Sequence, residues 1–379
     1  MSTLNVEGIK NTAATSNAIT LAADGTCTAN VTNGLSNRRL NHNGAMLVSQ
    51  RGTSTAWAAN GYLTCDGWVH NINSSAGRWT AKQTADGPDG FSKCLELDVT
   101  TADTSIAAAE HALIQYKWEG QDVQCLGKGT PGAKKFTVSF YVKGNGNATY
   151  YCEFYDRTND RVIRQQFAVT ASWTRVILTF NNETSNAITA DNSHELDMMI
   201  WLHAGSDFSS GSYTANTWSD KVNANRYVGG SSIFSSTNNY FRITGVQVEV
   251  GSVATDFEHK SYGEELTRCQ RYLRVYGGNS AYERVGVGFF SNTTRLECPI
   301  CLAPQMRTTP ALTVSNAGHW KGEAPSGNGE FTAVGLDGNS NNQLAVVWGD
   351  KSNTFTAGES GRFVADNTTD ARLYLSSEM

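Results

Sequence analysis

Two pairs of carboxylates are the first residues in this chain that could do chemistry. Glu195 and Asp197 alternate along a predicted strand, so both fall on one of its faces, and Glu264 and Glu265 are adjacent farther on. Facing carboxylates can act as acid and nucleophile in a glycosidase. Acidic residues on strand surfaces are common, however, and the chain lacks the motifs of serine hydrolases, zinc proteases and nucleotide-binding loops. The sequence therefore predicts a protein that is not an enzyme, with a glycan depolymerase as an alternative.

A long polar segment, residues 206–239, has the composition of a sugar-binding loop. It is rich in Ser, Gly and Asn and carries four side chains that could hold a glycan: Tyr213, Trp218, Arg226 and Tyr227. Aromatic faces stack on pyranose rings, and hydroxyl and amide groups bind sugar hydroxyls. The same aromatic residues could instead pin the loop to the fold. Exposure of Tyr213 and Trp218 in a concave site would favour glycan binding, and burial of both would favour a structural role.

Candidate metal ligands are scattered along the chain. Asp66, Asp156 and Asp160 lie in predicted loops, but none belongs to the spaced Asp/Asn pattern of a dedicated calcium loop. Cys298 and Cys301 have the spacing of a redox or zinc pair, without a second such pair or a nearby histidine. We interpret them as two strand residues that flank a proline. The sequence predicts no cofactor, with a structural calcium ion as the alternative.

The eight cysteines raise the question of disulfide bonds. The opening residues MSTLNVEGIK lack the basic and apolar stretches of a secretory leader. We therefore expect a reducing compartment, in which the thiols stay free and are mostly buried.

Composition excludes two classes of partner. The 379 residues carry a net charge of −5, and only 17% of them are charged, with no concentrated basic patch. This argues against nucleic-acid binding. No stretch approaches the roughly 20 apolar residues of a membrane helix, so membrane insertion is not expected. Abundant Gly and scarce Pro, 36 against 6, together with many polar turns are typical of short β-strands.

Periodicity predicts an all-β chain in four parts. Residues 1–57 are poor in aromatic side chains and predict a β-rich segment for anchoring or oligomerisation. Residues 58–256 contain eight or nine candidate strands and predict a jelly-roll sandwich, which ends in the alternating strand 241–250 with an irregular step at Gly245. Residues 257–276 predict a helical linker that starts at the capping box Ser261-x-x-Glu264. Residues 277–379 predict an antiparallel β domain.

The linker also resembles a known family. Residues 257–276, FEHKSYGEELTRCQRYLRVY, are similar to a segment that recurs in bacteriophage tail and capsid fibres, with departures at Lys260 and Leu273. Residues 44–54, GAMLVSQRGTS, and the opening MSTLNVEGIKN are weaker matches to the same proteins. The resemblance implies a jelly roll of carbohydrate-binding-module type ahead of the linker. It also implies a virion location, with assembly in the cytoplasm of the host bacterium.

From this we predict a structural virion protein that binds a host-surface glycan without catalysis. The expected partners are other virion proteins and two further copies of the chain, since phage fibres are usually trimeric. Leu266, Cys269 and Leu273 would form a narrow stripe along the linker helix, suited either to a three-fold contact or to packing on the chain's own sandwich. A capsid-decoration or tail-connector protein without a sugar site is the alternative.

Overall fold

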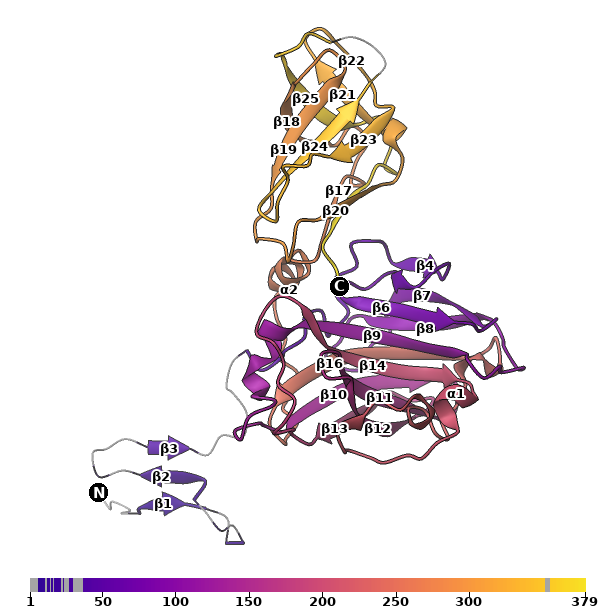
Figure 1. The fold of residues 1–379 in the computed structure, drawn as a ribbon, viewed down its shortest axis with the longest axis vertical. Coiled ribbons are helices and arrows are strands. Elements are labelled where there is room, and N and C mark those ends of the chain that lie inside the picture. Colours follow the sequence, from indigo (N-terminus) through magenta and orange to yellow (C-terminus); the bar gives the residue numbers. More distant parts are fainter. Residues whose placement is uncertain are drawn as a thin grey trace.

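The computed structural model describes residues 37–351 and 355–379 and, nearer the N-terminus, residues 6–10, 12, 13, 15, 17–21, 23 and 27–29. Its regular structure is almost entirely antiparallel β-sheet, so the predicted all-β class is confirmed. The parts of the predicted N-terminal segment that include Leu4, Asn30 and Val31 lie outside the described residues. A small N-terminal sheet, a β-sandwich and a C-terminal β domain follow one another along the chain (Figure 1).

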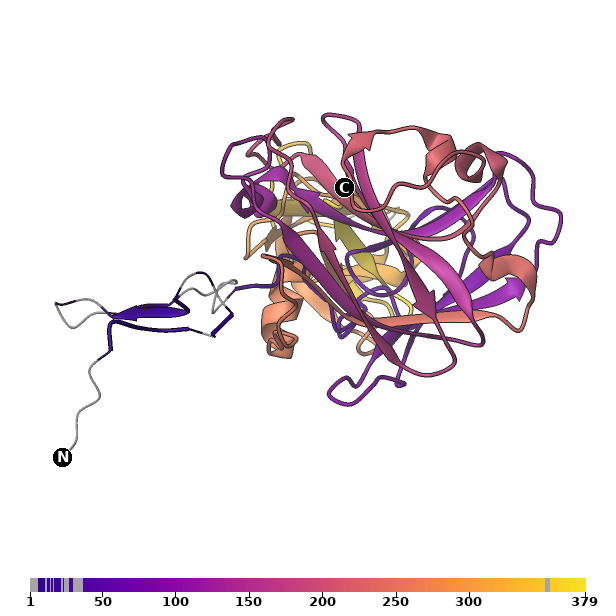
Figure 2. The same cartoon turned by 90° about the horizontal axis from the view of Figure 1, so that it is seen from below.

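The N-terminal sheet consists of β1 (Gly8–Ile9), β2 (Ile19–Leu21) and β3 (Cys27–Ala29). It stands away from the sandwich in both views (Figures 1 and 2). Ile9 lies opposite Ile19 in the register, and Ile9 and Leu21 are exposed. This sheet therefore presents apolar side chains that the described part of the chain does not cover.

Residues 37–57 belong to the sandwich, which differs from the predicted boundary at residue 57. Met46 and Val48 are fully buried, and β4 (Ser54–Ala56) pairs with the sandwich strand β7. The scarcity of aromatic residues concealed this, because Met46, Val48 and the hydrogen-bonded side chains of Asn41 and Asn43 hold the segment in place.

Two sheets form the sandwich. The six-stranded sheet, here called sheet I, runs in the order β13 (Thr174–Phe180), β10 (Phe136–Gly144), β16 (Tyr240–Val250), β8 (Cys94–Thr101), β7 (Arg78–Thr84) and β4. The seven-stranded sheet, sheet II, runs in the order β15 (Ser219–Asp220), β12 (Arg161–Val169), β11 (Ala148–Asp156), β14 (His194–Ala204), β9 (His111–Glu119), β6 (Trp68–Asn73) and β5 (Gly61–Tyr62). Short helical turns are η1 (Gly120–Leu126), α1 (Ser206–Ser209), η2 (Asn223–Asn225) and η3 (Ile233–Ser235).

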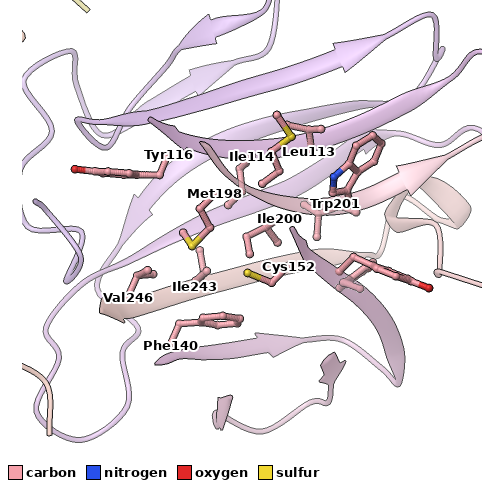
Figure 3. Packing of buried hydrophobic residues seen from close by; sticks show 14 of the residues in the cluster. Leu113, Ile114, Tyr116, Phe140, Cys152, Met198, Ile200, Trp201, Ile243 and Val246 are labelled. Atoms are coloured by element: carbon pink, nitrogen blue, oxygen red, sulfur yellow. The ribbon is translucent and has the colours of Figure 1, made fainter. Parts of the chain in front are cut away.

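Alternating side chains of the two sheets meet in one core. In sheet I the alternate residues Phe136, Val138, Phe140 and Val142 of β10 are buried, as the pattern predicts. Figure 3 shows Met198 and Ile200 of sheet II directed toward Ile243 and Phe140 of sheet I. The irregular step at Gly245 is confirmed, because the β10–β16 register shifts there and Gly245 has φ +63°.

Sheet II is buried on both faces, unlike a sheet with one face in water. Nine of the eleven residues of β14 are buried, including the outward Met199 and Trp201. Residues 205–235 cover this outer face, where Phe208 and Tyr227 pack on Trp201. The near-continuous apolar run of β14 follows from this cover.

Helix α2 (Tyr262–Cys269) joins the sandwich to the C-terminal domain. The predicted capping box is present, with Ser261 and Glu264 satisfying each other's main-chain N–H groups. Glu265 is buried and accepts hydrogen bonds from Arg39 and from the main-chain N–H of Asn43 (2.5 Å). A buried carboxylate with these partners ties the helix to the sandwich.

The two longer segments that carry the phage resemblance meet at this junction. The side chain of Gln50 donates to the main-chain oxygen of Leu273 (2.9 Å), and Arg271 forms a two-bond ion pair with Glu119 of β9. Of the predicted stripe, Cys269 and Leu273 are buried within one chain, whereas Leu266 is half-buried. Leu273 lies beyond the end of α2, so the helix carries only two of the three stripe residues.

The C-terminal domain pairs a small sheet with a larger one. The small sheet runs β17 (Leu273–Tyr276), β26 (Leu373–Ser376) and β20 (Ala311–Val314). The larger sheet runs β22 (Gly327–Glu330), β21 (Trp320–Ala324), β25 (Ser360–Ala365), β18 (Arg284–Phe290), β19 (Arg295–Cys301), β24 (Leu344–Asp350) and β23 (Ala333–Leu336), with the turn η4 (Ala317–His319) before β21. Its core is centred on Phe290, Trp320, Phe331 and Phe363.

The last residues return to the sandwich (Figure 1). Tyr62 donates to the main-chain oxygen of Met379 (3.1 Å), and Arg51 pairs with Glu378 (3.0 Å). The C-terminal domain is therefore held to the sandwich by α2 and by the last residues of the chain, which follow its final strand.

Two further predictions can be compared with the structure. The structure describes seven cysteine side chains; all seven are free and five of them are buried, and Cys298 and Cys301 lie in β19 on either side of Pro299. No helix among the described residues is long and apolar enough to cross a membrane.

Two core histidines make the fold sensitive to acid. Burial lowers the pKa of His70 to about 3, and burial together with the charge of Arg39 lowers the pKa of His42 to about 3. Neither ring nitrogen of His70 has a hydrogen-bond partner among the described residues. An unfolded histidine titrates near 6.5, so the unfolded chain binds more protons between pH 6.5 and 3. Stability is therefore present above pH 6.5 and is lost as the pH falls through this window.

We predict that acidification from pH 7 to pH 5 lowers the unfolding free energy by about 4 kcal/mol through these two groups. Replacing His70→Leu should remove about half of that loss, because the variant has one buried imidazole fewer to protonate. Urea unfolding followed by tryptophan fluorescence at several pH values measures both. An equal loss in the variant and the parent protein would contradict the assignment.

Candidate functional site

Arg226, one of the predicted glycan-binding residues, lies inside the protein. It is 8% exposed, and its Nε donates to Glu153 Oε1 of β11 (3.0 Å) while the guanidinium stacks on Trp201 at 4.6 Å. Tyr227 is 1% exposed, and its hydroxyl donates to the main-chain oxygen of Ser231. These two side chains hold the loop on sheet II and present no face to a sugar.

Tyr213 and Trp218 are half-buried, which lies between the exposure expected of a glycan site and the burial expected of a structural role. Tyr213 accepts a hydrogen bond from the main-chain N–H of Gln166 (3.1 Å), and Trp218 Nε1 donates to the main-chain oxygen of Asn181 (2.8 Å). The hollow beside Trp218 measures only about 10 Å³. This hollow is too small for a sugar. The hydrogen bonds of Tyr213 and Trp218 therefore indicate that both residues anchor the loop.

The structure gives each predicted calcium ligand another partner. The Lys128 ammonium, beneath Trp218, contacts Asp156, Glu183 (2.7 Å) and the main-chain oxygen of Asn186 (2.7 Å). Asp160 pairs with Lys221 (2.5 Å). Lys128 thus supplies the positive charge that a cation would supply to this group of oxygens.

Asp66, the third predicted ligand, accepts from Gln50 Nε2 (2.6 Å). No group of three or more His, Cys, Asp or Glu side chains in the described part of the chain is arranged to hold a metal ion.

The paired carboxylates of β14 are also engaged. Glu195 accepts from the hydroxyl of Thr158, and Asp197 pairs with Arg157 (3.0 Å) and with His194. These contacts give both carboxylates a structural role.

The last third of the predicted loop forms a cavity at one end of the sandwich, here called the end pocket. It has a volume of about 250 Å³. Its wall is formed by the turn between β10 and β11, by the ends of β12 and β16 and by the segment that contains η3: Gly144, Asn145, Gly146, Asn147, Ala148, Tyr150, Val169, Ser231, Ser232, Ser235, Asn239 and Tyr240. The wall contains side-chain amides, hydroxyls and two tyrosines, and it contains no charged side chain.

Tyr150 provides the strongest sign of a ligand site in this pocket. The residue is 5% exposed, and its ring packs edge-on against Phe241 and beside Phe167. Its hydroxyl makes no hydrogen bond with the residues that the structure describes, and burial of the ring raises its pKa. The hydroxyl is not among the fully buried atoms without a partner, so it is open enough to bind a molecule in the pocket.

Hydrogen bonds fix the opposite wall. Asn145 Nδ2 donates to Asn239 Oδ1 (2.9 Å), and Asn239 Nδ2 donates to the main-chain oxygen of Ile233 (2.8 Å). Ser231 Oγ accepts from the main-chain N–H of Thr149 (3.0 Å) and keeps its own hydrogen for a ligand. The wall is therefore ordered before a ligand arrives.

In the sequence, the glycine-rich segment Lys143-Gly-Asn-Gly-Asn147 joins two predicted strands and is interpreted as a hairpin turn; the structure differs. β10 lies in sheet I and β11 in sheet II, so the turn crosses from one sheet to the other. The alternating pattern of the two strands is the same in either arrangement, which is why the sequence suggested a hairpin. The crossing places Asn145 and Asn147 at the rim of the end pocket.

The sequence pointed to the loop that forms part of the end pocket, but it did not identify most of the residues that line the pocket. The composition of residues 206–239 pointed to the loop that supplies Ser231, Ser232, Ser235 and Asn239. Tyr150 and Tyr240 lie in strands, where alternation marks them only as strand residues. The Asn-Gly-Asn turn carried a signal, since amides beside glycine present both side chain and main chain to a ligand.

A second cavity of about 270 Å³ lies at the linker junction. Its wall includes Arg39, His42, Asp122, Arg268 and Arg271, and three of these residues belong to the contacts that hold the junction. This cavity is charged, in contrast to the end pocket.

Comparisons with known proteins give likenesses among solved structures. No protein-family model matches the chain, and no curated protein matches it. A structure titled "CBM4 structure and function" is 11% identical and has a TM-score of 0.27; it covers 55% of this chain and 97% of its own. The family 11 carbohydrate-binding module of a cellulosomal cellulase of Clostridium thermocellum is 8% identical, with TM-score 0.27 and coverages of 53% and 97%. The CBM22-1 xylan-binding domain of Paenibacillus barcinonensis Xyn10C is 12% identical, with TM-score 0.26 and coverages of 55% and 99%.

The contribution of the Arg226–Glu153 ion pair to stability can be measured by replacing one partner or both. We predict that Arg226→Met destabilises the sandwich by about 3–5 kcal/mol, because it leaves the Glu153 carboxylate buried without its cation. The double variant Glu153→Met, Arg226→Met should recover part of this loss, since the carboxylate and its ion-pair partner leave together, while the buried Arg164 opposite Glu153 keeps its charge. Chemical denaturation of the three proteins gives the comparison. A double variant as unstable as the single one would show that packing, and not the charge, holds the loop.

Proposed function

We propose that the protein is a bacteriophage virion component whose end pocket binds a neutral sugar unit of a host-surface glycan. The observation that carries the binding role is the Tyr150 hydroxyl, which makes no hydrogen bond in the described structure and belongs to an uncharged pocket wall of amides and hydroxyls. The virion assignment is supported by the resemblance of residues 44–54 and 257–276 to phage fibre proteins.

A sugar ring suits this wall in two ways. Its hydroxyls pair with side-chain amides and hydroxyls, which both donate and accept hydrogen bonds. Its C–H face packs on aromatic and aliphatic groups such as Tyr240 and Val169. A volume of about 250 Å³ is below the usual range for drug-sized ligands, so the pocket suits a single ring with its neighbours outside.

One shallow sugar site is weak, and repetition of the site would strengthen attachment. We propose that copies of the chain associate through the N-terminal sheet, whose exposed Ile9 and Leu21 have no cover in the described structure. A three-stranded sheet without a core needs such a partner. Several pockets on one assembly raise avidity by orders of magnitude.

A purely structural virion role is the second candidate. It is favoured by the internal contacts of Arg226 and Tyr227 and by the hydrogen bonds of Tyr213 and Trp218, which make most of the loop a cover for sheet II. In that role the end pocket would bind no sugar.

We predict that Tyr150→Phe weakens sugar binding by about 2–10-fold, because it removes one hydrogen bond and keeps the ring. Gly146→Trp should weaken it further, since space is open at that position and a large side chain can enter the pocket. Saturation-transfer NMR with glucose, galactose, N-acetylglucosamine and glucuronic acid gives the measurement, and the neutral sugars should give the signals.

Tyr262→Phe is the matched control, because this tyrosine is 58% exposed on α2, far along the chain from the pocket residues. It should bind as the parent protein does. Equal binding by Tyr150→Phe, Gly146→Trp and the parent would place the sugar elsewhere, and no binding by the parent would favour the structural role.

A further inference from the structure

Ser232, in the wall of the end pocket, is the first member of a hydrogen-bonded row of three side chains. Its Oγ lies 2.7 Å from His203 Nδ1, and His203 Nε2 lies 3.2 Å from Glu110 Oε2. Ser232 is half-buried beside the pocket, whereas His203 and Glu110 are buried. A hydroxyl, an imidazole and a carboxylate therefore follow one another from the cavity into the protein.

This order is the one that activates a serine. The carboxylate accepts from one imidazole nitrogen and fixes the tautomer in which the other nitrogen can accept the serine proton. Burial also lowers the pKa of His203, which keeps the ring neutral and able to act as a base. The row is recognised by these roles and not by the place of its members in the sequence.

A local irregularity in β14 points His203 into this row. The β14–β9 register shifts between Trp201 and His203, so that His203 lies opposite Ala112, an inward position. Regular alternation would have placed His203 on the same face as Trp201. Bulges of this kind redirect a side chain and are common beside active sites.

The two flanking residues are fixed by main-chain contacts. The main-chain oxygen of Glu110 accepts from Gly205 (2.7 Å), which immediately follows β14. Ser232 precedes η3, and its Oγ accepts from the main-chain N–H of Phe234 (3.1 Å). This N–H would also stabilise negative charge on Oγ when the proton leaves.

We propose that Ser232 is a nucleophile and that the end pocket hydrolyses acyl esters. Ser232 Oγ attacks the ester carbonyl carbon while His203 takes the hydroxyl proton. The carbon–oxygen bond to the alcohol then breaks, the alcohol leaves with the proton from His203, and an acyl-serine remains. Water attacks the acyl-serine with His203 again as base, which releases the carboxylic acid and restores the serine.

The oxyanion that forms in each step needs a hydrogen-bond donor, and we assign this role to Asn147, an exposed residue of the same pocket wall. Ser232 and His203 are the catalytic residues, and Glu110 is a positioning residue that acts through His203.

The substrate class rests on the proposed function: a sugar that binds this uncharged pocket and carries an O-acyl group would present its ester to Ser232. The chemistry itself does not depend on the sugar. Sequence patterns do not reveal this row of side chains, because its members are separated by 93 and 29 residues and Ser232 lies in Gly-Gly-Ser-Ser-Ile instead of a nucleophile motif.

A fluorophosphonate probe on the full chain tests the nucleophile directly. We expect one label per chain on Ser232, found by intact mass and peptide mapping. The label should be lost in Ser232→Ala and kept in Ser231→Ala and Ser235→Ala, the two other serines of the same wall. Hydrolysis of p-nitrophenyl acetate should fall roughly 100-fold in Ser232→Ala. An unlabelled Ser232 in the folded parent protein, or equal labelling of Ser235, would overturn the proposal.

Glu110→Gln tests the positioning role. This variant keeps a hydrogen-bonding side chain but loses the charge, so we expect slower hydrolysis and a shifted pH–rate profile with labelling still at Ser232. An unchanged profile would remove Glu110 from the mechanism. Sugar binding measured in Ser232→Ala separates the two proposals, because the binding role predicts that it is retained. Labelling of Ser232 without sugar binding would leave the hydrolase and reject the glycan substrate.

Discussion

The buried ion pair between Arg226 and Glu153 constrains much of the sandwich. It attaches the segment after β14 to the middle of sheet II, where Trp201 and Tyr227 complete an apolar cover. Because the segment is held there, its final part must descend to the end of the sandwich before β16 begins. That path brings Ser231, Ser232 and Asn239 beside the turn that crosses between the sheets. The end pocket is a consequence of this anchored loop.

Two further buried carboxylates connect the sandwich to the helix and to the C-terminal domain. Glu265 fixes α2 against residues 39–43, and Glu119 binds Arg271 just beyond the helix. The final strand then returns to pair with β17, and the last residues contact Tyr62. Both connections lie at the same junction, where their hydrogen bonds hold the C-terminal domain on the sandwich.

Local patterns in the sequence predicted the elements well. Alternation located the central strands of both β domains, and Ser261 with Glu264 marked the start of the helix. Patterns failed where tertiary contacts decide the outcome. β14 is apolar on both faces because a loop covers it, and Met46 enters the core although its surroundings lack aromatic residues. The turn at Gly144 was placed in a hairpin because alternation does not reveal which sheet a strand joins.

The candidate site was likewise predicted only where local patterns decide the outcome. The loop composition indicated a polar surface rich in hydroxyl and amide groups, and the structure uses that surface at the end pocket. The aromatic residues of the loop turned inward, since Trp and Tyr serve equally as anchors and as stacking platforms. Tyr150 and His203 could not be singled out in advance, because their significance depends on a missing hydrogen-bond partner and on a shift of register.

Binding of a neutral sugar in the end pocket can be observed in a crystal structure of the full chain soaked with N-acetylglucosamine, galactose or glucose. We expect a sugar ring within hydrogen-bond distance of the Tyr150 hydroxyl and of the Asn145–Asn239 wall. A sugar on the outer face of sheet I, or on the C-terminal domain with the end pocket empty, would contradict it.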